Sequence, residues 1–101
     1  QLERAVILAP NVAEFQYQLA LMLSRQGDLD GAVDHLQQAL HSEPNHYMAH
    51  DSLGAVLLKQ GKLTEARAHF EQALLINPQF DSAQQNLAAV LLALNRSPGS
   101  R

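Results

Sequence analysis

Proline recurs in this chain at one fixed interval: Pro10, Pro44 and Pro78 stand 34 positions apart (44 − 10 and 78 − 44). Most residues between the prolines recur with the same offset when 11–44 is laid over 45–78. The matching pairs are Asn11 and Asn45, Leu19 and Leu53, Leu23 and Leu57, Gly27 and Gly61, Leu29 and Leu63, Ala32 and Ala66, His35 and His69, Ala39 and Ala73, and Leu40 and Leu74. A repeat of this length is typical of a solenoid, in which one small helical unit stacks on the next. Because solenoids form extended surfaces, the repeat favours binding over catalysis.

The composition fits one small soluble domain with a continuous core, since 47% of the 101 residues are hydrophobic and 17% are charged. The seven Lys and Arg are scattered and the net charge is −3, so we expect no nucleic-acid surface. Cysteine is absent, and no apolar run approaches the ~20 residues of a membrane helix. The composition leaves the compartment open, with a lean towards the cytoplasm. The chain begins with Gln1 and has no signal peptide, so we expect it to be part of a longer protein.

Apolar residues within each interval fall at helical spacing, and no segment alternates as a strand would. The predicted helices span 12–26, about Ala32 to the residue before Pro44, about 46–60, about 64–76, and a last segment after Pro78 that ends at Asn95-Arg96. Gly27 and Gly61 are expected to end the first helix of each pair, and Thr64 is expected to be an N-cap.

The same offset organises the ends of the chain. Residues 2–5 align with 36–39 and with 70–73, so the N-terminus is expected to be the end of an earlier second helix. This makes six helices: two complete pairs flanked by two halves. The predicted array is 1–96, divided into 1–10 (the end of a preceding repeat), the repeats 11–44 and 45–78, and 79–96 (the first helix of a further repeat). Residues 97–101, Ser-Pro-Gly-Ser-Arg, are expected to be a disordered tail.

Small and large residues recur at fixed places in each unit. A Leu precedes a small residue in the first helix, a Gly forms the turn, and an Ala, a large apolar residue and another Ala follow in the second helix. The positions are Leu19-Ala20, Leu53-Gly54 and Leu87-Ala88; Gly27 and Gly61; Ala32 and Ala66; Leu36 and Phe70; Ala39 and Ala73; and the closing Pro44 and Pro78. Small residues allow helices to approach closely while large ones fill the space beside them.

In this pattern the chain resembles the tetratricopeptide repeat family, whose unit is a helix–turn–helix of 34 residues. The resemblance covers essentially residues 1–96 and implies an all-α, right-handed superhelical solenoid of helical hairpins. One position departs from it. Where the family often carries Trp in the first helix, this chain has Gln16, His50 and Gln84.

Histidines are the main candidates for metal or acid–base chemistry. His46 and His50 lie four residues apart with Asp51 adjacent, a spacing that can place two imidazoles on one helical face. His46, however, follows Pro44-Asn45 at the entry of the helix, and no HExxH pattern accompanies it, so we expect no metal site.

His35 and His69 occupy equivalent places, where the family often has an aromatic ring. We expect each to lie half-buried along the seam with the next helix. No pattern brings a nucleophile to a base and an oxyanion hole, and no Gly-rich phosphate loop is present. The sequence therefore predicts no catalytic residue, no cofactor and no metal ligand, and the chain is not expected to be an enzyme.

The resemblance implies that the first helix of each pair lines the concave face of the superhelix, and helical spacing selects its side chains. They are Glu14, Tyr17, Gln18, Leu21, Ser24 and Arg25 in the first unit; Met48, Asp51, Ser52, Ala55 and Lys59 in the second; and Ser82, Gln85, Asn86, Ala89 and Ala93 in the last helix. We expect apolar contacts from Tyr17, Leu21, Met48 and Ala55. A polar ladder of Gln18, Ser52 and Asn86 could hydrogen-bond the backbone of an extended peptide, or it could simply face water.

Chaperone-binding members of the family grip a C-terminal carboxylate with a clamp of Lys, Arg and Asn. At the corresponding places this chain has Tyr17, Leu21 and Ser52, and Asp51 would repel a carboxylate. The clamp is therefore not expected, and a neutral or mixed ligand is favoured.

The leading hypothesis is a scaffold module of a larger protein that binds a protein or peptide partner, with no role for nucleic acid or membrane. One alternative is an architectural element that self-associates through a terminal helix, because no second helix follows the last one. The residues of that apolar stripe are Leu87, Val90, Leu91 and Leu94. Another alternative is a regulatory or substrate-guiding part of an enzyme, such as a glycosyltransferase, whose catalytic domain lies outside this chain.

Overall fold

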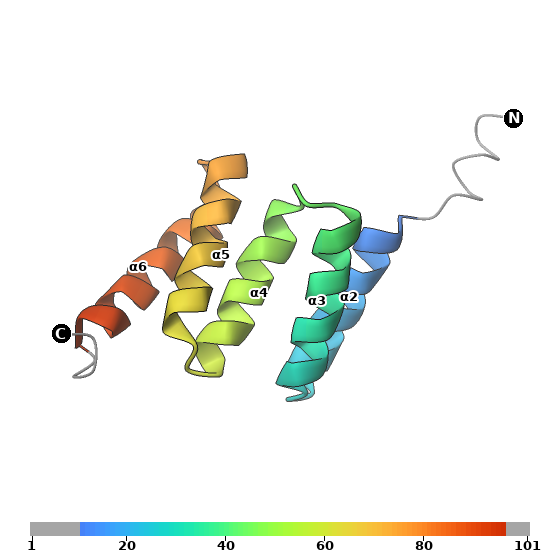
Figure 1. Ribbon diagram of the computed structural model, residues 1–101, viewed down its shortest axis with the longest axis horizontal. Helices are drawn as coiled ribbons and strands as arrows, with labels where there is room; N and C mark the ends of the chain where they lie inside the picture. The colour runs from blue at the N-terminus through green and yellow to red at the C-terminus, as the bar shows by residue number, and fades with distance from the viewer. Residues whose placement is uncertain (1–10, 97–101) are drawn as a thin grey trace, which may run out of the picture.

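The computed structural model describes residues 11–96, which contain five helices and no strand. The helices are α2 (Val12–Arg25), α3 (Leu29–Ser42), α4 (Tyr47–Lys59), α5 (Leu63–Ile76) and α6 (Asp81–Arg96). The hairpins α2–α3 and α4–α5 stand in a row, with α6 at the far end (Figure 1). This all-α helical-repeat solenoid is the predicted fold class. The sixth predicted helix, within residues 1–10, and the predicted tail at 97–101 lie outside the described residues.

Each hairpin turns at a glycine with left-handed backbone, Gly27 at φ 90° and Gly61 at φ 80°. The residue after each glycine donates its N–H back across the turn, Asp28 to the carbonyl of Leu23 and Lys62 to that of Leu57, both at 2.9 Å. This bonding satisfies carbonyls left open at the helix end, and glycine adopts the required φ without steric cost. The two predicted turns are therefore confirmed.

Side chains cap three of the helix starts: Asn11 caps α2, Asp28 caps α3 and His46 caps α4. Asn11 Oδ1 accepts from the Glu14 N–H at 3.0 Å, and Asp28 Oδ1 accepts from the Gly31 N–H at 2.9 Å. The predicted cap at Thr64 is wrong, because α5 already begins at Leu63. Its N-cap is Lys62, which makes no side-chain capping bond. The tight glycine turn ends one residue earlier than the sequence suggested, so Thr64 falls inside the first helical turn.

The core pairs small residues on one helix with large ones on another. Ala20, Ala32, Leu36, Ala66 and Phe70 are fully buried. Phe70, Leu36, Leu53 and Val90 are the largest side chains that are fully buried. Close approach at alanine and interdigitation at leucine and phenylalanine give the dense packing that such hairpins need.

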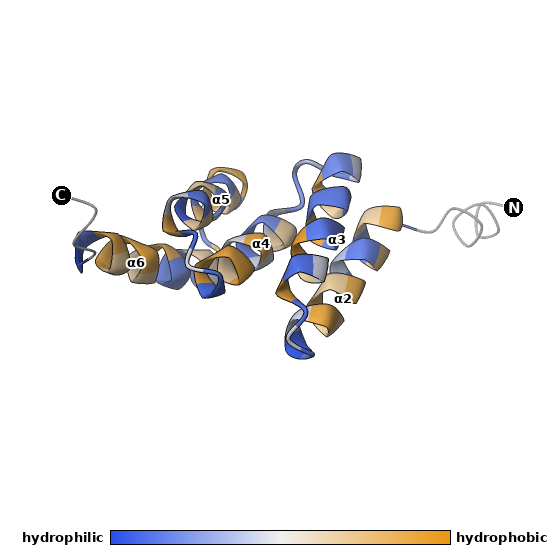
Figure 2. Cartoon of the chain, turned by 60° about the horizontal axis from the view of Figure 1, so that its bottom comes forward, coloured by the Kyte–Doolittle hydropathy of each residue, from blue (hydrophilic) through white to orange (hydrophobic). Residues whose placement is uncertain are grey.

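Helix α4 occupies the centre of the row. Within residues 11–96 it contacts every other helix, whereas α2 and α3 touch neither α5 nor α6. Its buried residues are Ala49, His50, Asp51, Leu53, Gly54, Val56 and Leu57. By contrast α2, at one end of the row, leaves Val12, Phe15 and Met22 exposed at 55%, 65% and 48%. Apolar segments are visible along α2 and α6, the helices at the two ends (Figure 2).

Candidate functional site

Helices α2, α4 and α6 run side by side in the same direction and carry the positions predicted to face a groove (Figure 1). We call the surface formed by these predicted positions the groove face. All of the following keep accessible surface: Glu14, Tyr17, Gln18, Leu21, Arg25, Met48, Ser52, Ala55, Lys59, Ser82, Gln85, Asn86 and Ala89. Asp51 alone among the predicted groove positions is buried, at 7% exposure. The three first helices therefore offer one surface of mixed polar and apolar character.

His46 joins α2 to α4 at one seam of the groove face. Its Nδ1 accepts the Ala49 N–H at 3.1 Å and caps α4, while its Nε2 lies 3.2 Å from Glu14 Oε1. Because Nδ1 accepts a backbone N–H, the ring is the Nε2–H tautomer and donates to Glu14. The Tyr17 ring packs against the imidazole with centroids 4.8 Å apart. His46, only 6% exposed, is thus a structural residue of this seam.

Glu14 is also bonded along its own helix. Gln18 Nε2 donates to Glu14 Oε2 at 2.7 Å. This bond, assisted by His46, lowers the pKa of Glu14 against an opposing effect of desolvation. Gln18, the first member of the predicted ladder, therefore already uses one amide hydrogen to bond Glu14.

Asp51 joins α4 to α6 at the second seam. Its Oδ2 accepts from Ser82 Oγ at 2.6 Å, and its Oδ1 accepts from Asn86 Nδ2 at 3.0 Å. A buried carboxylate is stabilised when both oxygens accept hydrogen bonds in this way. Asp51 therefore fastens two helices and is not a free group that could meet a ligand. Asn86, the third member of the predicted ladder, keeps one amide hydrogen and its carbonyl for other contacts.

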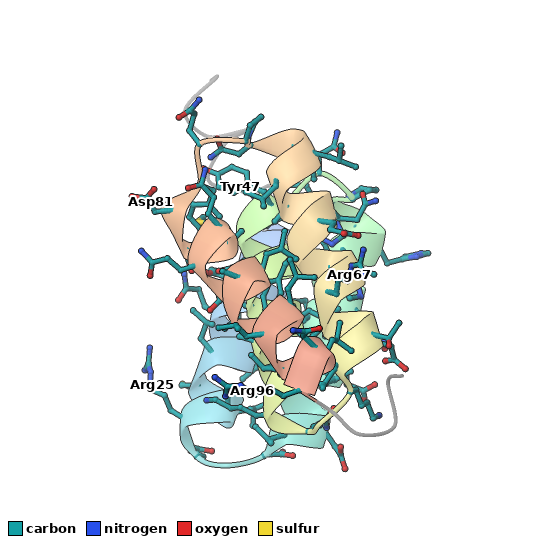
Figure 3. All side chains as sticks on the ribbon, turned by 90° about the vertical axis from the view of Figure 1, so that its left-hand side faces the viewer. Arg25, Tyr47, Arg67, Asp81 and Arg96 are labelled. Atoms are coloured by element: carbon teal, nitrogen blue, oxygen red, sulfur yellow. The ribbon has the colours of Figure 1, made fainter. Side chains whose placement is uncertain are left out.

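Charge is distributed unevenly along the groove face. All three first helices end with a cation, Arg25, Lys59 or Arg96, where it complements the helix dipole. Acidic residues stand in the first turns of α2 and α6, at Glu14 and Asp81. Arg25 and Arg96 lie towards one end of the helices and Asp81 at the other, while Arg67 lies on the opposite flank of the molecule, on α5 (Figure 3). The face is thus basic at one edge.

Three surface hollows border the helices that carry the groove face. One is lined by Val12 and Gln16 of α2 with residues of α3. Another, of about 420 Å³, lies between Leu74, Leu75 and Leu87. A third, on the flank of α2, is lined by Phe15, Gln18, Leu19, Met22 and Arg25, and therefore shares Gln18 and Arg25 with the face.

Two polar contacts lie inside the hairpins. His35 Nδ1 bonds Gln16 Oε1, and His69 Nδ1 lies 3.1 Å from His50 Nδ1. His35 and His69 are half-buried as predicted. Their partners, however, stand on the preceding helix of the same hairpin and not on the next helix.

Within residues 11–96, no three His, Asp or Glu side chains gather as metal ligands. No helix in that range has the length and apolar character of a membrane span.

The predicted self-association stripe on α6 is divided between core and surface. Val90 is fully buried and Leu87 packs against the core, because α4 and α5 already cover that side of α6. Leu91 is 42% exposed and Leu94 is half-buried. Val90 is therefore not available to a partner, and Leu91 with its neighbour Leu92, 54% exposed, forms the accessible part.

Comparison with known proteins gives two kinds of match. A family model described as tetratricopeptide repeat matches residues 1–46, 17–86 and 52–101. Among solved structures, the first TPR of Spaghetti (RPAP3) bound to the HSP90 peptide SRMEEVD has a TM-score of 0.81 at 18% identity, covering 84% of this chain and 69% of that one. The crystal structure of MamA has a TM-score of 0.79 at 26% identity, covering 91% of this chain and 54% of that one. No curated protein matches the sequence.

Proposed function

Because the chain belongs to the tetratricopeptide repeat family, we propose that it is a protein-interaction module that binds an extended segment of a partner on the groove face. In this proposal the units are 11–44 and 45–78, with 1–10 and 79–96 belonging to neighbouring units. The observation that carries the proposal is the accessible surface that almost every predicted groove residue keeps along α2, α4 and α6. A structural neighbour solved with a bound peptide supports a peptide or protein partner.

The chemistry of the face suggests which segment it would take. Tyr17, Leu21 and Ala55 provide partly buried apolar contacts, while Gln18 and Asn86 retain amide groups that can bond a peptide backbone. Arg25 and Lys59 favour acidic side chains at one edge. Because Asp51 is already bonded by two donors, it adds no free acceptor to the centre of the face. We therefore infer an extended segment of mixed character with acidic residues near one end.

Peptide selection followed by titration tests this proposal. A displayed library of random peptides is selected on the whole chain, and an enriched peptide is titrated by fluorescence polarisation. Tyr17→Ala and Lys59→Ala are expected to weaken binding about fivefold or more, the loss typical of a residue that contributes about 1 kcal/mol. Arg67→Ala is the control, because Arg67 lies on α5 and pairs with Glu71 of the same helix. Equal losses from all three variants would contradict the groove model.

A second candidate is self-assembly through the ends of the row. It is favoured by the exposed Phe15 and Met22 of α2 and by Leu91 and Leu92 of α6. The equivalents of Phe15 on α4 and α6, Ala49 and Ala83, are fully buried, so a second copy of the chain could cover the α2 face. Light scattering over a concentration series tests this: species above 11.1 kDa that Leu91→Glu or Phe15→Glu shifts towards monomer support it, and a strict monomer refutes it.

A further inference from the structure

Two imidazoles meet inside the α4–α5 hairpin. His50 Nδ1 and His69 Nδ1 are 3.1 Å apart, and the rings stack with centroids separated by 5.4 Å. The other nitrogen of His50, Nε2, lies 3.0 Å from the carbonyl oxygen of Pro44. His50 is 9% exposed and His69 is half-buried.

The partners fix where the protons are. A carbonyl oxygen only accepts, so His50 Nε2 carries the hydrogen that bonds Pro44. In neutral His50 the Nδ1 atom is then bare and accepts from His69 Nδ1–H. One added proton is accommodated at His69 Nε2, because the Nδ1–H of the resulting imidazolium still donates to His50. A second proton places N–H groups face to face and two positive charges in contact, so the bond between the rings is lost.

The first hairpin provides an internal comparison. Gln16 and His35 are the equivalents of His50 and His69, and there an amide oxygen meets His35 Nδ1. That oxygen does not titrate, and protonated His35 can still donate to it. Gln84, the third equivalent, donates its Nε2 to the Pro78 carbonyl at 2.7 Å, as His50 does to Pro44. A glutamine is thus able to make each contact that His50 makes.

We propose that the His50–His69 contact makes the α4–α5 hairpin open in mild acid, whereas the α2–α3 hairpin, with Gln16 in the equivalent place, stays closed. Met48, Ser52 and Ala55 of the groove face stand on α4, so the opening would also disturb that face. The proposal concerns the hairpin itself and holds whether or not the groove face binds a peptide.

Burial is the main reason why the pKa values of both imidazoles lie below the ordinary value. Burial lowers the pKa of His50, helped by His46 and opposed by the Pro44 carbonyl. Burial and His50 lower the pKa of His69, opposed by Glu65 of α5. On the helices that pack around α4, several titratable groups have other partners: Asp30 of α3 accepts from Gln60, His35 of α3 bonds Gln16, and Arg67 of α5 pairs with Glu71. Glu14 of α2 bonds His46, Asp34 and His41 of α3 lie beside Val12 and Gln16, and Asp81 and Arg96 stand in the first and last turns of α6.

The lowered pKa values of His50 and His69 mean that acid destabilises the α4–α5 hairpin. Both imidazoles have a lower pKa in the folded state than the ordinary value of about 6.5, so the opened hairpin binds more protons. The stabilisation is present above about pH 6.5 and is lost as the pH falls through the folded-state values. A hairpin that relies on this contact therefore weakens on acidification.

Amide hydrogen exchange on the whole chain tests the proposal, comparing about pH 7.5 with about pH 5 after correction for intrinsic exchange rates. In the wild type, protection in α4–α5 is expected to fall about tenfold or more beyond any change in α2–α3, because the opened hairpin binds more protons. His50→Gln should abolish the difference, and Gln16→His should confer acid sensitivity on α2–α3. If His50→Gln proves unstable, His69→Gln is the alternative. Equal acid effects in both wild-type hairpins, or a difference that survives either glutamine substitution, would overturn the proposal.

Discussion

Gly54 packs against the ring of Phe70 so closely that a Cβ on Gly54 would stand 2.5 Å from Phe70 Cε1 and 2.7 Å from Cδ1. Phe70 is fully buried, so the ring has little room to move. In the first hairpin the equivalent positions are Ala20 and Leu36, also fully buried. The larger Phe70 thus faces the smaller Gly54, whereas the smaller Leu36 stands with Ala20 in the equivalent places of the first hairpin.

Gly54→Ala is expected to destabilise the protein by about 1–3 kcal/mol, the usual cost of overpacking, despite the better helix propensity of alanine. Adding Phe70→Leu recreates the Ala–Leu pair of the first hairpin. The double variant should therefore be less destabilised than the sum of the two single variants. A urea-unfolding double-mutant cycle measures this coupling, and strict additivity would show that the two sites relax independently.

Phe70→Ala is expected to reduce the free energy of unfolding by about 3–5 kcal/mol, since it removes a fully buried ring and leaves a cavity. Leu75→Ala is a matched control on the same helix, because Leu75 is 74% exposed. The control should change stability by no more than about 0.5 kcal/mol. Similar losses from both variants would mean that α5 is rotated from the orientation described.

Asp51→Ala and Asn86→Ala should each destabilise the α4–α6 seam by about 1–3 kcal/mol, because each breaks a hydrogen bond to a buried carboxylate. Together they should cost less than the sum, since both remove the same bond. Gln85→Ala, next to Asn86 and exposed, serves as the control. Thermal unfolding provides the readout, and a melting temperature unaffected by Asn86→Ala would argue that the bond does not stabilise the seam.

His46→Ala is expected to cost about 0.5–2 kcal/mol, the range for loss of an N-cap. His46→Asn should recover most of this loss, because asparagine caps helices well, while still lacking the imidazole that contacts Glu14 and Tyr17. Circular dichroism melts would distinguish the two variants. If asparagine were no better than alanine, the contacts to α2 and not the cap would account for the stability at this position.

The sequence alone was sufficient for features that depend on local pattern. The 34-residue offset located the hairpins, and Gly27 and Gly61 located their turns, because a left-handed residue ends a helix whatever surrounds it. The small residues at Ala20 and Gly54 likewise indicated where helices approach closely. These features need only neighbours within one unit.

Features that depend on contacts between units could not be read in the same way. Asp51 was predicted to face a ligand, yet its partners Ser82 and Asn86 lie 31 and 35 residues away and bury it. Val90 was predicted to be exposed, yet it is covered by helices earlier in the chain. His46 carried a signal that was available, its position just before the helix, but histidine is an uncommon cap.

The central position of α4 has a mechanical consequence. Within residues 11–96 this 13-residue helix alone connects the α2–α3 hairpin to α5 and α6, so any tension along the row passes through its two sides. A small rotation of α4 relative to its neighbours would therefore change the curvature of the surface that α2, α4 and α6 form.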